Sequence, residues 1–439
     1  MSGSRSREYL WGRSSSNEDA VPLHYPLLAV LAIAASIAPT TWLLSDFHGY
    51  LVSGAVLCLV IGYGVLFADI RIRIDSAFLV LFGGYWVGLL VHYLYLPNPS
   101  LLQYIFVTPI TVFATVVVLP RFVADRPQSF AMGLTLLAVL VMGIGVLMLW
   151  QFHTSGIEYS WVGEEVMGLY AIRTPSVFAN PNTYGFFMMI GSLAALYTVL
   201  VRGGLIWIAA LGLCLLGLFM SEGDAAIFGF GLGSVLVLSG RNRILSFVGV
   251  GASVAAIYAM IRVGHFSEVM QTTLMSRVDR WVLSLERLAL DPLWGIGFVD
   301  AGPEIGGYTG PHNSYIEVLL HTGVIAGMLY LGALIYAAGC GIRNRWTQWT
   351  GFVVGTAAGV FTYMFFESLI LGGLSTSSVV LGLVTGLMLL PDPKREHGRV
   401  RSTASEHSSR PPVVERTLSR VFSVRDDGIE SSSETEETN

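Results

Sequence analysis

Long apolar stretches separated by short polar connections form the dominant pattern along this 439-residue chain. An α-helix needs about 20 apolar residues to cross the hydrocarbon core of a bilayer. Runs of about that length recur along most of the chain, and two of them, within 204–239, are separated only by the polar turn Ser221-Glu222-Gly223-Asp224. We therefore expect twelve membrane-spanning helices, near 26–44, 49–68, 76–96, 101–119, 130–150, 183–201, 204–220, 224–239, 244–261, 314–341, 347–366 and 370–390.

The composition is that of a chain dissolved mainly in lipid. Hydrophobic residues make up 53% of the sequence and charged residues only 13%, which is too apolar for a soluble surface. Cys58, Cys214 and Cys340 lie inside predicted spans without paired spacing. We interpret them as small packing residues and expect neither a disulfide framework nor a thiolate metal site. The expected fold class is all-α, a polytopic integral membrane protein.

The arginines predict which loops face the cytoplasm. Basic residues in short loops mark the cytoplasmic side, and an even number of spans places both termini on that side. Only two connections are long, 151–182 and 262–313, and we expect both on the outer face. These two loops hold Arg173, Arg262, Arg277, Arg280 and Arg287, whereas the cytoplasmic loops and N-terminal tail hold Arg5, Arg7, Arg13, Arg71, Arg73, Arg121, Arg126, Arg202, Arg241, Arg243, Arg343 and Arg345.

Both ends of the chain are expected to lie outside the membrane domain. Residues 1–24 are polar and lack the cleavage pattern of a signal peptide, which indicates a cytoplasmic N-terminal tail. From residue 392 the chain is rich in Ser, Arg, Glu and Thr and almost free of aromatic residues, a composition that does not fold on its own. Residues 25–391 are therefore the predicted transmembrane domain, and 392–439 a disordered cytoplasmic tail.

The longer outer loop predicts an amphipathic helix that begins near Arg277 and ends at Asp291-Pro292. Two interpretations stay open. The guanidinium row can face lipid headgroups while the apolar side lies in protein or lipid, or it can form a cradle for a diphosphate, because guanidinium groups bind phosphate oxygens in pairs. At about 100° per residue, the polar side carries Arg277, Arg280, Ser284 and Arg287, and the apolar side Val278, Trp281, Val282, Leu285, Leu288 and Ala289.

A histidine stands at the mouth of the tenth predicted span, in Gly310-Pro311-His312-Asn313-Ser314. Before it, Gly295-Ile296-Gly297 and Gly306-Gly307 are expected to loosen the backbone. Such a histidine can hold or release a proton near neutral pH, or it can serve as a helix cap. The shorter outer loop ends with Arg173 and Asn180-Pro181-Asn182 before the sixth span, which fits either a hydrogen-bonding rim or a capped helix start.

These segments together resemble the O-antigen ligase and Wzy-type polymerase family, polytopic glycosyltransferases that act on polyprenyl-diphosphate-linked sugars. The resemblance covers roughly residues 170–340, whereas the first five spans match only in hydropathy. It implies a GT-C-like arrangement of about twelve transmembrane helices with two larger outer loops. It is carried by Arg173 with Asn180-Pro181-Asn182, by Arg277 with Trp281, by Pro292 with Gly295 and Gly297, and by His312-Asn313 with Tyr315 and Gly323.

The resemblance also implies a mechanism. Arg173 and Arg277 are expected to hold the lipid diphosphate, and His312 to activate the acceptor hydroxyl, with inversion at the anomeric carbon. It implies no metal and no cofactor. The expected partners are a polyprenyl-diphosphate-linked glycan donor, a glycan, lipid or protein acceptor, and membrane lipid, with no nucleic acid. Further expected substrate contacts are Arg280, Arg287, Asn180, Asn182 and Asn313.

The chain departs from the family at one turn. Many relatives carry an arginine in a Ser-x-Ser-Arg pattern between the seventh and eighth spans, whereas this chain has Ser221-Glu222-Gly223-Asp224. Arg280, Arg287 or Arg262 is a candidate to supply the missing charge; alternatively, the acids bind a different acceptor.

A transporter or flippase of a lipid-linked anion is the alternative from another class. Its coupling sites are expected among the ionisable residues Glu222, Asp224, Glu317 and Glu367, since such groups inside a membrane are functional by default. The unusual charges cluster on one face, and no inverted repeat of interrupted helices is evident, which favours the enzyme. Ligase and polymerase share a donor site, so the sequence leaves both open.

Overall fold

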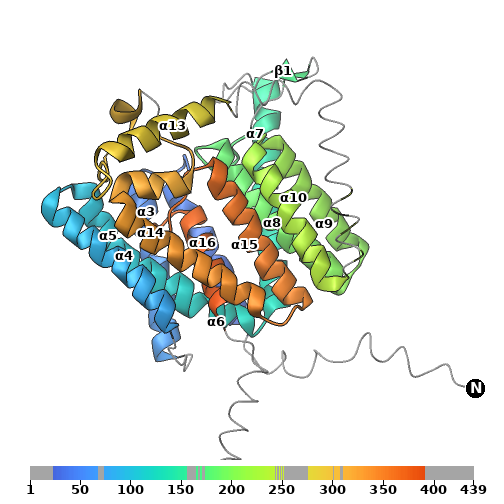
Figure 1. Ribbon diagram of the computed structural model, residues 1–439. Coiled ribbons are helices and arrows are strands. Elements are labelled where there is room, and N and C mark those ends of the chain that lie inside the picture. Colours follow the sequence, from blue (N-terminus) through green and yellow to red (C-terminus); the bar gives the residue numbers. More distant parts are fainter. Residues whose placement is uncertain are drawn as a thin grey trace, which may run out of the picture. The chain divides into compact units, whose positions relative to one another are not determined.

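The computed structural model describes residues 23–67, 74–155, 165–166, 169–170, 174–242, 244, 247, 249, 251, 275–299, 301–306 and 310–390. The chain divides into two units, Met1–Leu390 and Pro391–Asn439, and every described residue belongs to the first. Its elements (Figure 1) are α2 (His24–Ala35), η1 (Ala38–Thr40), α3 (Asp46–Leu66), α4 (Ser76–Tyr95), α5 (Pro99–Val112), η2 (Phe113–Val118), α6 (Leu119–Ala124), α7 (Pro127–Ser155), β1 (Glu165–Val166), β2 (Leu169–Tyr170), α8 (Pro181–Arg202), α9 (Leu205–Met220), α10 (Asp224–Arg241), α13 (Met275–Leu290), η4 (Gly302–Ile305), α14 (Ser314–Arg343), α15 (Gln348–Phe366) and α16 (Thr376–Leu389).

Among the described residues, every secondary-structure element is helical except one antiparallel pair of two-residue strands, β1 and β2. Eight of its helical segments are long and apolar enough to cross a membrane. Three shorter apolar segments, His24–Thr40, Leu205–Met220 and Thr376–Leu389, accompany them. These segments coincide with all the predicted spans except the ninth, 244–261, most of which lies outside the described residues. The all-α membrane class is thus confirmed.

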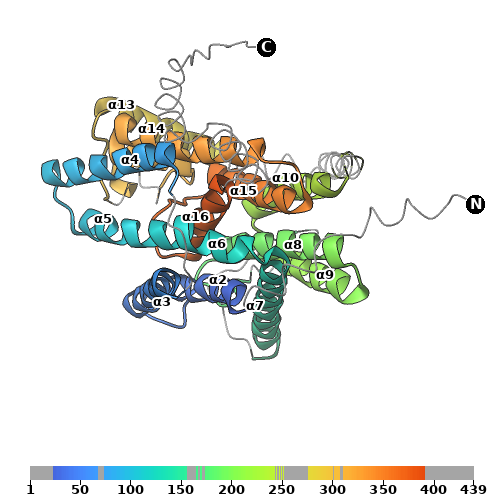
Figure 2. The same ribbon diagram turned by 90° about the horizontal axis from the view of Figure 1, so that it is seen from below.

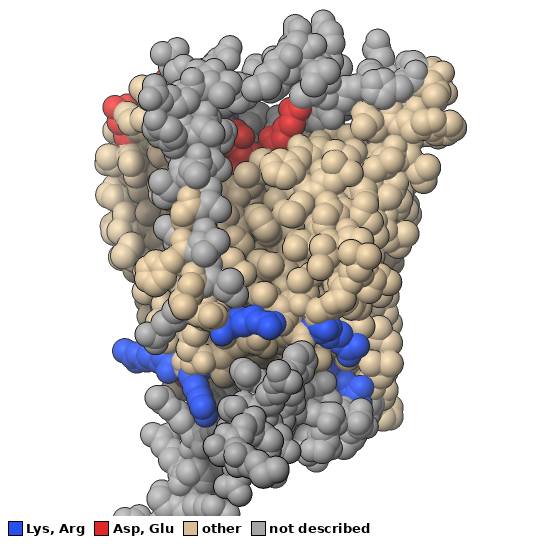
Figure 3. Space-filling model, turned by 90° about the vertical axis from the view of Figure 1, so that its right-hand side faces the viewer, with Lys and Arg blue, Asp and Glu red and all other residues tan. Residues whose placement is uncertain are grey.

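Charge separates the two ends of this helical unit. Arg202, Arg241 and Arg343 stand in the last turns of α8, α10 and α14, and Arg241 donates a hydrogen bond to the Leu200 carbonyl oxygen. We call this the arginine end. On the face shown in Figure 3, arginine side chains gather toward one end and acidic side chains toward the other. The opposite end, where α13 packs on α14, is the α13 end (Figures 1 and 2).

Helices α10 and α15 lie side by side along a glycine seam (Figures 1 and 2). Gly229 and Gly233 of α10 oppose Gly359 and Gly355 of α15, so the two helices run antiparallel. A Cβ added at Gly355 would lie 2.6 Å from the Gly233 carbonyl oxygen, and one at Gly359 would lie 2.9 Å from that of Gly229. Small residues allow this close backbone approach, which supplies van der Waals contact where lipid removes the hydrophobic driving force.

Replacing Gly355 by alanine is expected to destabilise the protein by about 1–3 kcal/mol, as overpacking of a tight interface does. The added methyl meets backbone atoms of α10, so the helices must separate. Thermal unfolding of the detergent-solubilised protein measures the effect. Gly231→Ala is the matched control, because its Cβ meets nothing within 4 Å; equal melting temperatures for the two variants would show that the seam does not limit stability.

Helix α14 is broken near its start, although one continuous span is predicted there. Gly323 has φ +76°, and the Val324 N–H donates instead to the Pro292 carbonyl oxygen at 2.8 Å. The Ile296 N–H likewise donates to the Leu320 carbonyl oxygen at 2.8 Å. The loop after α13 therefore docks into the break, and the first part of α14 lies beneath α13 (Figure 1).

Glycines permit this docking. A Cβ at Gly295 would lie 2.1 Å from the Leu320 carbonyl oxygen, and one at Gly323 would lie 1.9 Å from that of Leu293. Gly295 and Gly297 both have positive φ, which glycine adopts without steric cost. For Gly295 and Gly297 the expectation that glycines loosen the backbone is therefore wrong, because this segment packs tightly against α14.

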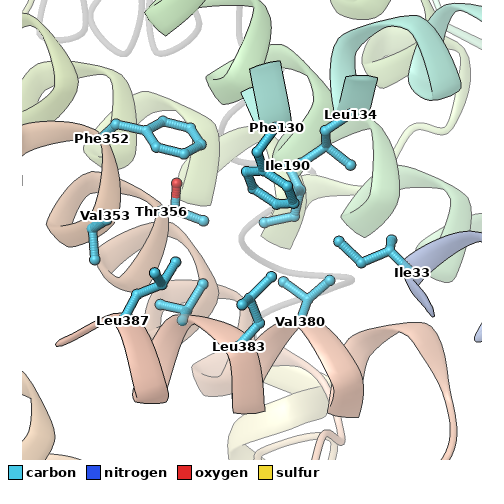
Figure 4. A pocket seen from close by; sticks show the side chains of 11 residues that line it. Ile33, Phe130, Leu134, Ile190, Phe352, Val353, Thr356, Val380, Leu383 and Leu387 are labelled. Carbon is cyan, nitrogen blue, oxygen red and sulfur yellow. The ribbon is translucent and has the colours of Figure 1, made fainter. Parts of the chain in front are cut away.

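A small apolar pocket lies among α2, α7, α8, α15 and α16 (Figure 4). Thr356 contributes the only polar side chain among its lining residues. Phe130 and Phe352 come from the first two turns of α7 and α15, which begin at the arginine end. The pocket lacks charged groups and is remote from the α13 end, so we interpret it as a packing gap.

Candidate functional site

One buried carboxylate joins four elements at the α13 end. Glu367 caps the C-terminus of α15 and is only 7% exposed. Its Oε1 lies 3.0 Å from Arg277 Nη2 of α13 and accepts a hydrogen bond from Asn182 Nδ2 of α8 at 3.1 Å. Its Oε2 lies 3.4 Å from His312 Nδ1, just before α14. We call Glu367, Arg277, His312 and Asn182 the Glu367 cluster.

Hydrogen bonds around the cluster fix the backbone that carries it. The Ser314 hydroxyl donates to the Glu367 carbonyl oxygen at 2.7 Å and accepts from the Leu369 N–H at 2.8 Å. The Tyr363 hydroxyl donates to the Asn182 carbonyl oxygen at 3.1 Å. The start of α14 is thus tied to the end of α15, and α15 to the start of α8. Side chains held in this way meet the requirement that a site be pre-organised.

Arg277 points into the protein. Its side chain is 15% exposed, and its guanidinium lies 5.7 Å from the centre of the Phe366 ring. One turn later, Trp281 Nε1 donates to the Pro311 carbonyl oxygen at 3.0 Å, which anchors α13 on the segment before His312. The apolar residues Val282 and Leu285 are 48% and 47% exposed. The interpretation that the guanidinium groups face lipid headgroups is therefore wrong for Arg277. The predicted amphipathic helix is confirmed as α13.

His312 has an uncommon backbone conformation and is not a helix cap. Its φ is +48°, a region that few non-glycine residues adopt and that occurs at functional sites. The next residue, Asn313, caps α14 through hydrogen bonds that its Oδ1 accepts from the Tyr315 and Ile316 N–H groups. The imidazole is 31% exposed. The His312 side chain is thus partly accessible at the protein surface, while its Nδ1 atom faces Glu367.

The remaining predicted site residues occupy different positions. Asn180 is exposed and caps α8 by accepting from the Asn182 N–H at 2.8 Å. Arg280 and Arg287 are half-buried on α13, outside the Glu367 cluster. Arg173 and Arg262 lie outside the described residues. The structure therefore brings together Arg277, His312 and Asn182 of the predicted set, and it adds Glu367.

The acidic turn Ser221-Glu222-Gly223-Asp224 lies at the same end of the unit. Ser221 and Glu222 form the turn between α9 and α10, and the Met220 carbonyl oxygen accepts from the Thr174 N–H at 3.1 Å. In the first turns of α10, the Phe228 ring contacts Phe366, with 6.1 Å between ring centres.

Within the described ranges, no set of three or more His, Cys, Asp or Glu side chains has the arrangement of a metal site.

These features define a class: a polytopic, all-helical membrane protein with a buried ion-pair cluster at one end of its helices. Residues 187–331 match the family model described as O-antigen ligase. The resemblance to the O-antigen ligase and Wzy-type family predicted from the sequence is thus confirmed over this segment. The match includes Arg277 and His312, whereas Asn182 and Glu367 lie outside it. Among curated proteins, none matches the chain.

Proposed function

We propose that this protein is a membrane glycosyltransferase of the ligase or polymerase type. It moves a glycan from a polyprenyl diphosphate carrier to an acceptor hydroxyl at the outer face of the cell membrane. The O-antigen ligase domain supports this class of enzyme. The observation that carries the proposal is the convergence of Arg277 and His312 on Glu367, because it unites a phosphate-binding cation and a proton acceptor.

The proposed reaction needs few protein groups. His312 accepts the proton of the acceptor hydroxyl, whose oxygen bonds to the anomeric carbon as the bond from that carbon to the diphosphate oxygen breaks. The electron pair of the broken bond leaves with the diphosphate, and attack from the opposite face inverts the configuration. Arg277 stabilises the charge that develops on the leaving group, a function that fixed cations perform without a metal. Arg173, Arg280 and Arg287 are proposed as further donor contacts.

Aromatic side chains beside the cluster fit a lipid-linked donor. Phe365 and Phe228 are 45% and 42% exposed. Phe365 packs edge-to-face on Trp281 at 5.1 Å and on Phe366 at 5.2 Å between ring centres. Phe228 and Phe365 thus form an exposed apolar surface, here called the apolar ledge, beside Phe366. The guanidinium of Arg277 lies over the Phe366 ring. An isoprenoid chain on this ledge would place its diphosphate near Arg277.

We further propose that the α13 end is extracytoplasmic and that twelve spans form a GT-C-like arrangement with both termini in the cytoplasm. The positive-inside rule supports this orientation, since Arg202, Arg241 and Arg343 share the opposite end. In this orientation Glu367 and His312 are reached from the side on which finished glycans accumulate. A transporter is expected to expose its ionisable groups to both sides in turn, and the Glu367 cluster lies at one end alone.

Single cysteines are expected to react with an impermeant maleimide in intact cells at the exposed positions Ser155 and Glu286, and not at Arg345. The background replaces Cys58, Cys214 and Cys340 with alanine, since these cysteines are free thiols. Labelling after cell lysis controls for accessibility at all three positions. If the cysteine introduced in place of Arg345 reacts and the one in place of Glu286 is protected, the orientation is the reverse of the proposed one. This result would remove the basis for an outer-face enzyme.

A deletion strain tests the proposed function in cells. Loss of a polymerase is expected to leave surface acceptors capped with single glycan units, whereas loss of a ligase is expected to leave long chains on the lipid carrier. Either result supports the proposal and assigns the type. Unchanged lipid-linked and surface glycans in the deletion strain would contradict it.

A further inference from the structure

We infer that Glu367 is a positioning residue that links the donor-binding arginine to the catalytic base. The inference rests on the proposed function and assigns a role to a residue outside the segment that matches the family. It concerns the orientation and charge of His312 at the moment of transfer.

Each carboxylate oxygen of Glu367 meets a different part of the site. Oε1 pairs with Arg277 and accepts from Asn182, whereas Oε2 faces His312 Nδ1. An ionised carboxylate only accepts hydrogen bonds. In neutral His312 the proton must therefore be on Nδ1, which leaves the lone pair on Nε2. This assigns Nε2 as the atom that takes the proton from the acceptor hydroxyl.

Burial makes an uncompensated charge on the Glu367 carboxylate costly. Glu367 is 7% exposed, and a buried carboxylate is tolerated where cations and hydrogen-bond donors compensate it. Arg277 supplies the compensation through Nη2. A guanidinium has five N–H donors, and the described contacts of Arg277 engage one of its terminal nitrogens. The remaining donors are suited to phosphate oxygens while the ion pair persists.

Donor binding then strengthens the base. A diphosphate beside Arg277 competes with Glu367 for the positive charge of the guanidinium, so the carboxylate is less neutralised. It then stabilises the imidazolium that forms when Nε2 accepts the acceptor proton, since Nδ1–H of that imidazolium donates to Oε2. Proton transfer to His312 is thereby favoured when the donor occupies the site. Without a bound donor, His312 is a weaker proton acceptor.

Glu367→Gln separates this function from a structural one. Glutamine keeps the shape and removes the negative charge, so Arg277 is no longer neutralised by it. We expect polyprenyl diphosphate without its glycan to bind at least as tightly as to wild type. We expect turnover to fall roughly 10- to 100-fold, as for loss of a hydrogen bond to a charged group. Glu286→Gln, an exposed change on α13, is the matched control and should leave both quantities unchanged.

A purely structural Glu367 gives a different result: donor binding and turnover then fall together, in proportion to the folded protein recovered by size exclusion. That outcome, or normal turnover in Glu367→Gln, overturns the inference. If the glutamine variant does not fold, Glu367→Asp replaces it. Aspartate retains the charge but shortens the side chain beyond the reach of His312, so turnover should fall while donor binding persists; normal turnover in this variant overturns the inference equally.

Parallel variants distinguish failure of the inference from failure of the proposed function. Arg277→Ala and His312→Asn are assayed with the same donor. If both retain transfer, the proposed function is wrong. If both lose it while Glu367→Gln is normal, only the positioning function of Glu367 is wrong.

Discussion

Replacing His312 by asparagine is expected to lower glycan transfer by roughly 10²- to 10⁴-fold, the usual contribution of a positioned base, with donor binding close to that of wild type. Asparagine tolerates positive φ better than most residues, so the backbone at φ +48° is retained. Helix α14 keeps its cap because Asn313 supplies it. The substitution thus removes the proton acceptor with little structural change.

Purified protein of matched folded fraction allows this comparison. Donor binding is followed with polyprenyl diphosphate, and transfer with the complete lipid-linked glycan. His321→Asn is a useful control, because His321 lies two turns into α14 and its Nδ1 contacts the Gly297 carbonyl oxygen. Near-normal transfer by His312→Asn would exclude the base and leave the strained conformation of His312 without a catalytic explanation.

Loss of Arg277 is expected to have the opposite signature, with weaker donor binding as the primary defect. A hydrogen bond to a charged group contributes about 1.5–3 kcal/mol, so Arg277→Ala should raise the dissociation constant of polyprenyl diphosphate roughly 10- to 150-fold. Arg277→Lys should restore only part of the affinity for polyprenyl diphosphate, because lysine supplies the charge without the planar pair of donors. Equilibrium binding to detergent-solubilised protein measures both variants.

The ion pair with Glu367 complicates the alanine variant. Removing Arg277 leaves a buried carboxylate without its cation, which is itself strongly destabilising. The double variant Arg277→Ala/Glu367→Gln removes both charges and isolates the effect on the donor. Arg343→Ala, an exposed change at the arginine end, should bind donor normally. Wild-type affinity in the double variant would contradict a diphosphate site at Arg277.

Local patterns predicted the membrane helices and α13, because apolar length and a 3.6-residue period are set by neighbouring residues. Helix α13 begins two residues before Arg277, where the periodicity placed its start. The direction in which Arg277 points was not predictable, since it depends on Glu367, 90 residues further along the chain. Periodicity identifies the faces of a helix, whereas the partner of each face is a tertiary property.

Glu367 itself illustrates what the sequence leaves undecided. It follows the eleventh predicted span directly, and the pattern identified it only as an ionisable residue in a membrane, compatible with a transporter. Its assignment to the site requires the end of α15 to meet the starts of α8, α13 and α14 at one place. The break at Gly323 was likewise not predictable, because it lies within a continuous apolar run. The loop that stabilises the break contacts Val324 through Pro292, which lies far from Val324 in the sequence.

The most direct test of the central claim uses the donor that the deletion strain accumulates. Lipid-linked glycan extracted from that strain is incubated with purified protein and a membrane extract that supplies the acceptor, and release of polyprenyl diphosphate is measured. We predict release with wild-type protein, with an inverted anomeric bond in the product, and little release with His312→Asn. No release with folded wild-type protein, or equal release with His312→Asn, would contradict a glycosyltransferase site at the Glu367 cluster.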